Sequence, residues 1–158
     1  MIFIGIDIGF SGAIAVLDES KIIDAIDMPV LKAGKRTEIN ELHIRDLLAS
    51  YKHIEDKIAV FIEKAQSMPG QGIASTGRYL MSYGQIRGIC AGIGVGYTLV
   101  HPKTWKSAMM KDMPKEKQAS IIRCQQLFPN FPLPQRKDHG RADAILIAAY
   151  GRKMQYLL

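Results

Sequence analysis

The sequence predicts an α/β protein with a five-stranded mixed sheet and helices on both faces. Three observations predict it: short apolar runs rich in β-branched residues, amphipathic segments of helical period between the later runs, and a polar turn early in the chain. With 158 residues and a hydrophobic fraction of 47%, the chain is long enough to bury a sizeable core. We therefore expect one domain over residues 1–158.

Five apolar runs have the length and composition of strands: residues 2–9, 12–18, 21–28, 58–63 and 96–100. The polar turn at 18–21 indicates a hairpin between the second and third runs, so one strand of the sheet is expected to be antiparallel. Residues 29–38 are expected to form an exposed, mobile, basic loop. Asn40 is typical of a helix N-cap and precedes apolar residues at helical spacing up to Tyr51.

A long helix is predicted over residues 74–92, and one stripe of it is almost free of side chains because of Gly77, Gly84, Gly88 and Gly92. Each glycine costs a helix up to about 1 kcal/mol, so close packing against the sheet or a second subunit is expected to compensate. Shorter helices are predicted after His101, over 115–128 and from about Gly140. The buried stripe of the last helix is expected to be Ala142, Ile145, Leu146, Ala149, Met154 and Leu157.

Charge and cysteine content narrow the class of protein. Residues 101–158 hold 11 Lys and Arg against 4 Asp and Glu, whereas residues 1–100 hold 10 against 11. A basic C-terminal third is expected of a protein with a phosphate-rich partner, although a basic surface also serves solubility. Cys90 and Cys124 lack metal-ligand spacing and are expected to be reduced core thiols.

The apolar start of the chain does not have the pattern of a targeting or membrane segment. It has no basic leader, it contains Asp7 and three glycines, and it is too polar to span a bilayer. We therefore expect a protein without a membrane partner that is not secreted. Its expected location is the cytoplasm, an organelle, or the cytosol of a viral host.

Two of the apolar runs end in an acidic residue. Strand side chains alternate between faces, so Asp7 shares a face with Phe3 and Gly5, and Glu63 shares one with Ala59 and Phe61. If these strands are parallel neighbours, both carboxylates emerge at the same carboxyl edge, where open α/β sheets place their ligands. Like charges at close range are costly unless a cation lies between them. The pattern therefore indicates a metal site.

Two more carboxylates stand near the start of the last predicted helix. Asp143 falls in its first turn, and Asp138 lies just outside in the preceding loop. Packed across the two central strands, this helix start would complete a set of four oxygen ligands. Carboxylate oxygens with few histidines favour Mg²⁺ or Mn²⁺ over zinc. A pair of such ions stabilises both the attacking and the leaving oxygen when a phosphodiester is cleaved.

These motifs, in this order and spacing, resemble the RuvC-type Holliday junction resolvases of the RNase H-like superfamily. The resemblance covers nearly the whole chain and is closest to the phage-encoded and chloroplast-type branch. Its carriers are residues 5–12 (Gly-Ile-Asp-Ile-Gly-Phe-Ser-Gly), Ile62 and Glu63 with 68–72, 102–106 (Pro-Lys-Thr-Trp-Lys), and 138–144 (Asp-His-Gly-Arg-Ala-Asp-Ala). The first motif alone is weak, because sugar-kinase and actin-like ATPases share it.

The resemblance implies a homodimeric, Mg²⁺-dependent endonuclease that makes paired symmetric nicks in four-way DNA junctions during recombination and repair. Two ions per active site are implied, with Mn²⁺ able to replace Mg²⁺. Asp7, Glu63 and Asp143 match the invariant acidic positions. The bacterial branch carries an acidic residue or histidine three positions before the last aspartate, where this chain has Gly140. Asp138 resembles the replacement used in the phage and chloroplast branch, and His139 is the alternative ligand or proton-transfer group.

Several other residues are candidates for contact with DNA. Lys106 matches a family lysine near the cleavage site, and the weaker candidates are Lys103, Lys115, Lys117, Arg78, Lys64 and Arg141, each of which could equally be a solvated charge. Met68 is either a wedge between unstacked bases or a residue that anchors its own loop. Trp105 is expected to pack in the core rather than to stack on a base.

Three other functions are compatible with parts of the pattern. Another RNase H-like nuclease, acting on flaps, branched DNA or RNA–DNA hybrids, would have the same fold and metals. An ATP-binding protein of the actin and sugar-kinase type would need a second lobe, for which 158 residues leave no room. A non-catalytic junction-binding protein would not need all four carboxylates. A panel of DNA substrates with and without metal separates these hypotheses.

Overall fold

The computed structural model describes residues 1–34, 36–54, 57–66, 70, 72–116, 118–133 and 138–156. Five strands come first, helices and strands then alternate, and three helices follow one another after the last strand. Their bounds are β1 (Ile2–Asp7), β2 (Ala13–Leu17), β3 (Ile22–Asp27), β4 (Val30–Ala33), β5 (Arg36–Ile39), α1 (Glu41–Ile54), β6 (Ile58–Glu63), α2 (Ile73–Gly92), β7 (Tyr97–Val100), α3 (Pro102–Met109), α4 (Ala119–Leu127) and α5 (His139–Gln155).

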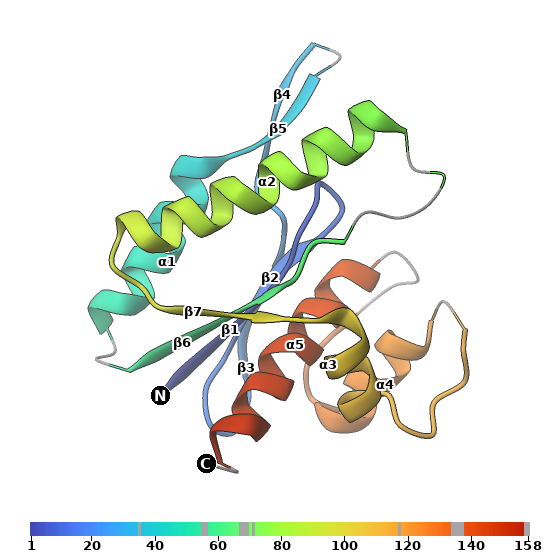
Figure 1. Cartoon of the computed structure of the whole chain (residues 1–158). Helices are drawn as coiled ribbons and strands as arrows, with labels where there is room; N and C mark the ends of the chain where they lie inside the picture. The colour runs from blue at the N-terminus through green and yellow to red at the C-terminus, as the bar shows by residue number, and fades with distance from the viewer. Residues whose placement is uncertain are drawn as a thin grey trace.

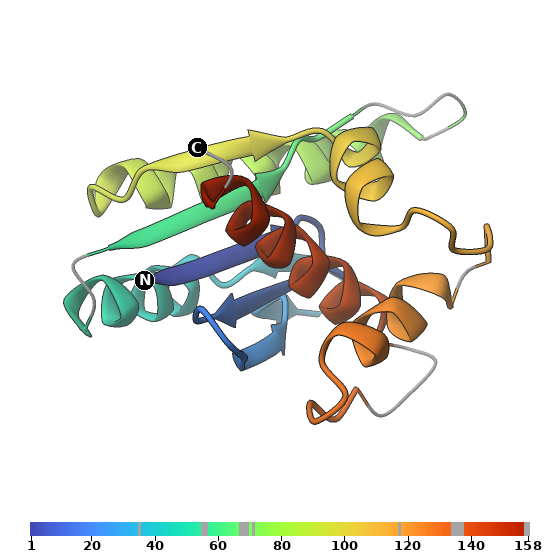
Figure 2. The ribbon, with the colours of Figure 1, turned by 90° about the horizontal axis from the view of Figure 1, so that it is seen from below.

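The main sheet has five strands in the order β3-β2-β1-β6-β7. The first three strands pair antiparallel, whereas β1, β6 and β7 run parallel to one another. Helices α3, α4 and α5 cover one face, and α1 and α2 cover the other (Figures 1 and 2). The predicted five-stranded mixed sheet with helices on both faces is confirmed.

Alternation along β1 divides its side chains between two cores. Phe3 packs with the residues of α3, α4 and α5, whereas Ile2, Ile4 and Ile6 pack with those of α1 and α2. All four side chains are buried. Because both faces of this central strand are covered, its sequence is almost continuously apolar.

Helix α5 approaches the sheet closely enough to require glycine at several contacts. A Cβ atom on Gly5 of β1 would lie 2.1 Å from the carbonyl oxygen of Ala144 and 2.5 Å from the nitrogen of Ala148. A Cβ on Gly151 of α5 would lie 2.2 Å from the ring of Phe61 on β6. The backbone of α5 therefore lies directly against β1 and β6, and this contact fixes the position of every side chain on the helix.

The prediction of a mobile loop at 29–38 is wrong, because β4 and β5 pair there as an antiparallel hairpin with Val30 opposite Ile39. Both residues pack into the core on the α1 and α2 side, and Gly34 turns the chain with a φ of 61°. Two apolar anchors thus hold a polar hairpin that projects beyond the sheet beside the first turns of α2 (Figure 1).

Two further differences concern helices. Helix α4 begins at Ala119 rather than 115, so Lys115 lies in the bend before it. On α5, Met154 is 38% exposed rather than buried, and Leu157 lies outside the described residues. The Asn40 N-cap is confirmed, since its Oδ1 accepts a hydrogen bond from the backbone nitrogen of His43 at 3.1 Å. Within the described ranges, no helix is long and apolar enough to cross a membrane.

The glycine stripe of α2 does not pack against the sheet. Its four members are exposed, and a Cβ atom placed on any of them would meet nothing within 4 Å. Leu80 and Met81 on the same helix are 45% and 47% exposed. Of the two explanations for the stripe, packing on the sheet is therefore excluded for the isolated chain.

Candidate active site

Asp7 and Glu63 are the last residues of two neighbouring parallel strands. The register pairs Gly5 with Phe61 and Ile6 with Ile62, so the two acids stand side by side at the carboxyl edge. Both project toward the α5 face, in register with Gly5 and Phe61. The juxtaposition predicted from the alternation of the two strands is confirmed.

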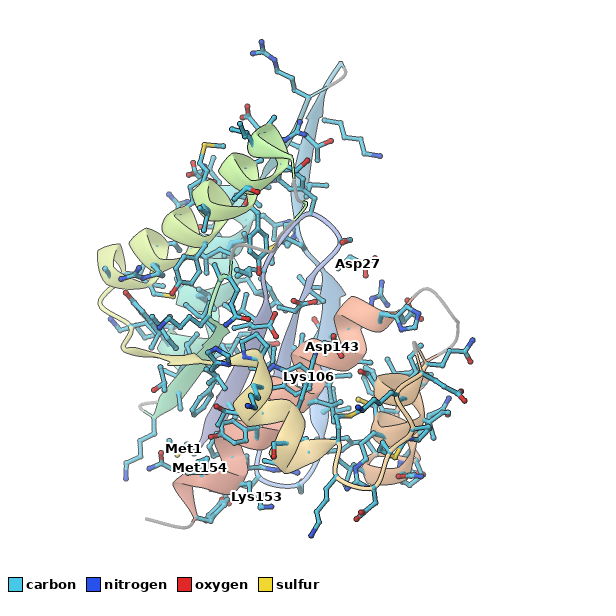
Figure 3. All side chains as sticks on the ribbon, turned by 45° about the vertical axis from the view of Figure 1, so that its right-hand side comes forward. Met1, Asp27, Lys106, Asp143, Lys153 and Met154 are labelled. Carbon is cyan, nitrogen blue, oxygen red and sulfur yellow. The ribbon has the colours of Figure 1, made fainter. Side chains whose placement is uncertain are left out.

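Asp143 reaches the same place from α5. It precedes Ala144, whose carbonyl is the atom nearest to the Cβ position of Gly5, so the close contact of helix and strand brings this carboxyl to the end of β1. Lys106 faces Asp143 from α3 (Figure 3), and its charge lowers the pKa values of Asp7, Glu63 and Asp143. Three segments far apart in the sequence thus place their acids in one electrostatic environment.

The three carboxyl groups hold their protons more tightly than exposed acids do. Burial, reinforced by the negative charges of Glu63 and Asp143, raises the pKa of Asp7 to about 8. Burial is also the main cause of the raised pKa values of Glu63 and Asp143. Asp7 donates a hydrogen bond to Glu63, which stabilises the ionised form of Glu63. Without a metal, Asp7 and Glu63 therefore share a proton at the place where a cation could bind.

Trp105 and Ser120 orient two of the acids. The indole nitrogen of Trp105 donates a 2.8 Å hydrogen bond to Oε1 of Glu63, and the Trp105 side chain is fully buried. Lys106 Nζ lies 5.1 Å from the centroid of the Trp105 ring, a cation–π contact. A hydrogen bond from Ser120 on α4 lowers the pKa of Asp143. Trp105 is thus in the core, as predicted, and also holds a carboxylate.

The residues present fit a divalent cation. Oδ1 of Asp143 is buried and has no hydrogen-bond partner among the described residues. Such an orphaned carboxylate oxygen is costly unless a cation or water meets it. Among the residues that the structure describes, no three His, Cys, Asp or Glu side chains form a preassembled metal cage. A cation that bound here would displace the proton that Asp7 shares with Glu63.

The two candidates for a fourth ligand differ in their surroundings. Asp138 stands at the N-cap of α5, accepts a backbone hydrogen bond from Ala142, and raises the pKa of Arg141. His139, one helical turn before Asp143, lowers the pKa of that acid. The structure brings Asp7, Glu63 and Asp143 together and places both candidates at the rim.

Gly140 has no room for a side chain. A Cβ atom there would lie 2.5 Å from the carbonyl oxygen of Ser11, in the connection between β1 and β2. A ligand at position 140 would therefore require that connection to move. The structure thus has no space for a side chain at the position where the bacterial pattern carries an acidic residue or histidine.

The predicted DNA-contacting residues that the structure describes lie on several different segments. Lys103 is exposed in the first turn of α3, next to Lys106, and Arg78 is exposed on α2. Lys64 is exposed just after Glu63. Met68 and Lys117 lie outside the described residues. Arg141 instead pairs with Asp27 at the end of β3, through Nε at 2.8 Å and a second nitrogen at 3.0 Å (Figure 3).

Sequence reasoning missed Tyr79 and the roles of Trp105 and Ser120. The charges of Glu63 and Asp7, after burial, raise the pKa of Tyr79 to about 12, so the phenol stays protonated beside the acids. No local motif identifies these residues, because their roles depend on contacts between distant segments. For Trp105, the position next to Lys106 is the one signal available in the sequence.

Comparison with known proteins gives one curated relative and several similar structures. No family model matches the chain. A segment of 94 residues, 57% of this chain, is 37% identical to "Holliday junction resolvase MOC1, chloroplastic" from Chlamydomonas reinhardtii. The matched segment amounts to only 10% of that protein's length.

Among solved structures, Thermus thermophilus RuvC in complex with a Holliday junction substrate superposes with a TM-score of 0.66 at 18% identity, covering 98% of this chain and 96% of that one. The yeast mitochondrial Holliday junction resolvase Ydc2 superposes with a TM-score of 0.56 at 19% identity, covering 97% and 78%. At such identities the likeness establishes the fold alone, which is the fold that RuvC and Ydc2 have.

Proposed function

We propose that this chain, which has the fold of the RuvC-type Holliday junction resolvases, is itself a metal-dependent endodeoxyribonuclease that cuts four-way DNA junctions. One observation carries the proposal: Asp7, Glu63 and Asp143 meet at the carboxyl edge of the sheet with raised pKa values and an unpartnered buried oxygen. The identity to a chloroplast Holliday junction resolvase supports the same substrate.

The donor set suits Mg²⁺, with Mn²⁺ as a substitute, because it consists of hard carboxylate oxygens. Asp7, Glu63 and Asp143 would hold the metal, with Asp138 or His139 as the outer ligand. When bound, two such ions activate a water molecule and stabilise the leaving oxygen of a phosphodiester. The number of ions is part of the proposal.

The chain's own residues contribute orientation and charge. Trp105 fixes the side chain of Glu63 through its 2.8 Å hydrogen bond. Lys106 is exposed beside the three acids and offers a positive charge to a phosphate that approaches them. Tyr79, kept protonated, offers a hydrogen-bond donor on the α2 side of the same edge. Lys103 extends the positive charge along α3.

A homodimer is part of the proposal, because a junction has approximate two-fold symmetry and paired nicks need two active sites. The exposed stripe of Gly77, Gly84 and Gly88 on α2 suits a close helix-to-helix contact, and Leu80 and Met81 would be covered by it. Action on DNA also implies a compartment that contains DNA, the cytoplasm or an organelle.

Incubation of the protein with a four-way junction, a flap, a nicked duplex and an RNA–DNA hybrid tests the proposal. We expect paired, symmetric nicks in the junction that require Mg²⁺ or Mn²⁺ and stop with EDTA. Asp7→Asn should bind the junction without cutting it, because the basic surface is unchanged. Faster cleavage of the flap or hybrid than of the junction would reassign the substrate, and metal-independent binding without cleavage would indicate a non-catalytic junction-binding protein.

A further inference from the structure

A cavity of about 490 Å³ with a mixed polar and apolar lining opens beside the carboxylates, on the α2 side of the connection between β1 and β2. Three segments line it: residues 8–11 of that connection, Thr37 of β5, and Ser75, Arg78, Tyr79 and Ser82 of α2. The volume lies within the usual range of small-ligand pockets. The hairpin that the sequence suggested was a mobile loop is therefore one wall of a cavity.

The lining chemistry favours an anionic ligand with a flat or apolar part. Arg78 and five residues with hydroxyl groups line the cavity (Ser11, Thr37, Ser75, Tyr79 and Ser82), and none of the described lining residues is acidic. The Ser82 hydroxyl donates to the carbonyl oxygen of Arg78. Hydroxyls and arginine are common donors to phosphate oxygens in complexes with nucleic acids. Phe10 adds a half-buried aromatic ring. A nucleotide offers both a phosphate and an apolar sugar or base face.

The cavity adjoins the candidate active site, both along the chain and through the electrostatic effect of its acids. Its first lining residue, Ile8, directly follows Asp7. Tyr79 lines the cavity and also feels the charges of Glu63 and Asp7. The Cβ position of Gly9 lies 3.6 Å from the Tyr79 ring, so the connection packs against α2 at this point. A strand whose phosphate lies at the carboxylates would pass directly over this connection.

We propose that this cavity binds the nucleotide next to the scissile phosphate in the cleaved strand, holding its phosphodiester with Arg78, Ser75 and Thr37 and its sugar or base against Phe10. The inference rests on the proposed function, since it names a second contact on the same DNA strand. It makes the β4–β5 hairpin a part of the substrate site rather than an appendage.

Lys32 extends this site outward along the hairpin. It pairs with Thr37 across β4 and β5, so the two side chains leave the hairpin on the same face. Thr37 lines the cavity and Lys32 is exposed further out. A strand leaving the cavity along this face would meet a second positive charge. The exposed Arg36 pairs with Ala33, so its side chain leaves the hairpin on the opposite face.

The test replaces single phosphodiesters near the cleavage position with neutral methylphosphonates, one at a time. Cleavage of the junction is measured under single-turnover conditions for the native protein, Arg78→Ala and Thr37→Val. Arg45→Ala and Thr98→Val are matched controls, because both residues lie outside the cavity lining and lose the same groups. The same scan is run as a binding assay with the Asp7→Asn protein, which needs no cleavage.

We expect one flanking position at which neutralisation slows cleavage and weakens binding by about tenfold, as loss of one charge-assisted contact predicts. In Arg78→Ala that position should no longer matter, because the partner of the phosphate is gone. In a separate assay with single-stranded DNA, the binding constant falls with salt concentration on a log–log plot. Arg78→Ala should make that slope shallower by about 0.7, the value for one phosphate contact. Both controls should stay within about twofold of the native protein.

Three outcomes would overturn the subsite: no position-specific loss, a loss that persists in Arg78→Ala, or equal defects in Arg78→Ala and Arg45→Ala. Competition by free dAMP or ATP at low concentration would assign the cavity to a free nucleotide instead of a strand. If the native protein cuts no junction, the proposed function fails, and the binding scan still decides the subsite on its own.

Discussion

Trp105 Nε1 lies 2.8 Å from Oε1 of Glu63, which makes a fully buried indole the partner of an active-site carboxylate. The hydrogen bond joins α3 to the end of β6. It holds one oxygen of Glu63 in place and lowers the pKa of that acid against the opposing effect of burial. The core and the candidate active site therefore share a residue.

Trp105→Phe removes this hydrogen bond and keeps a buried aromatic ring. We expect the cleavage rate to fall by about tenfold while junction affinity is unchanged, because loss of the bond costs roughly 1–2 kcal/mol of orientation. The acid limb of the pH–rate profile should shift to higher pH, because the pKa of Glu63 is no longer lowered by the indole. An unshifted limb would show that the indole only fills space.

Gly5→Ala tests the contact between β1 and α5. The new Cβ would lie 2.1 Å from the carbonyl oxygen of Ala144, so we expect a loss of about 3 kcal/mol in the free energy of unfolding. Gly96→Ala, just before β7, is the matched control, because nothing lies within 4 Å of its Cβ position. That variant should change the free energy of unfolding by less than about 1 kcal/mol, through the unfolded chain. Urea unfolding measures both, and equal effects would contradict the packing described.

Enlarging the glycine stripe tests the proposed dimer. Gly84→Leu places a bulky side chain on an exposed helix face, so the monomer should still fold. We expect sedimentation to shift from dimer toward monomer, and junction cleavage to lose its paired, symmetric character. Thr98→Leu, on the exposed face of β7, is the control and should leave the association state unchanged. A native protein that sediments as a monomer, with and without junction DNA, would rule out the dimer.

Metal-free stability should depend on pH through Asp7. Its folded pKa of about 8 lies above its ordinary value of 3.8, so the folded state binds a proton that the unfolded state releases. The contribution of Asp7 to the free energy of unfolding is fully present below pH 4. It is lost as the pH rises through 8, by at most about 1.4 kcal/mol per pH unit. The difference between native protein and Asp7→Asn in urea titrations from pH 5 to 8.5 isolates it. A difference independent of pH would contradict the raised pKa.

Asp143→Asn should stabilise the metal-free protein and abolish its response to Mg²⁺. The native carboxyl is buried near Asp7 and Glu63 with an unpartnered oxygen, so removing its charge relieves an unfavourable interaction. We expect a higher melting temperature at pH 8 without metal, and no further rise when Mg²⁺ is added. Asp27→Asn, an exposed acid outside the cluster, should keep the native response. Retention of that response by Asp143→Asn would exclude Asp143 as a ligand.

The sequence predicted the parts of the site that depend on strand alternation. Asp7 and Glu63 follow from the ends of two apolar runs, since a period of two and a parallel pair determine their common edge. The prediction of a mobile loop at 29–38 was wrong. The polar composition of that segment gave no sign that apolar residues at its two ends hold it in a hairpin. Val30 and Ile39 are nine residues apart, and nothing local indicates that they pair.

Other features were out of reach because they depend on distances between backbones. The close packing of α5 on β1 becomes apparent only in the folded structure, where the Ala144 backbone lies next to Gly5. The same holds for Tyr79, which comes near Asp7 and Glu63 only when α2 crosses the sheet. Each of these residues is ordinary in its local context.

The lack of space at Gly140 also bears on how such sites diverge. A single substitution cannot give this chain a side chain there, because the Ser11 carbonyl occupies the volume. An acid introduced at this position would need the backbone of Ser11 and Gly12 to move first. Whether α5 can offer a carboxylate at 140 thus depends on how closely the connection between β1 and β2 approaches the helix, which residue-by-residue comparison does not reveal.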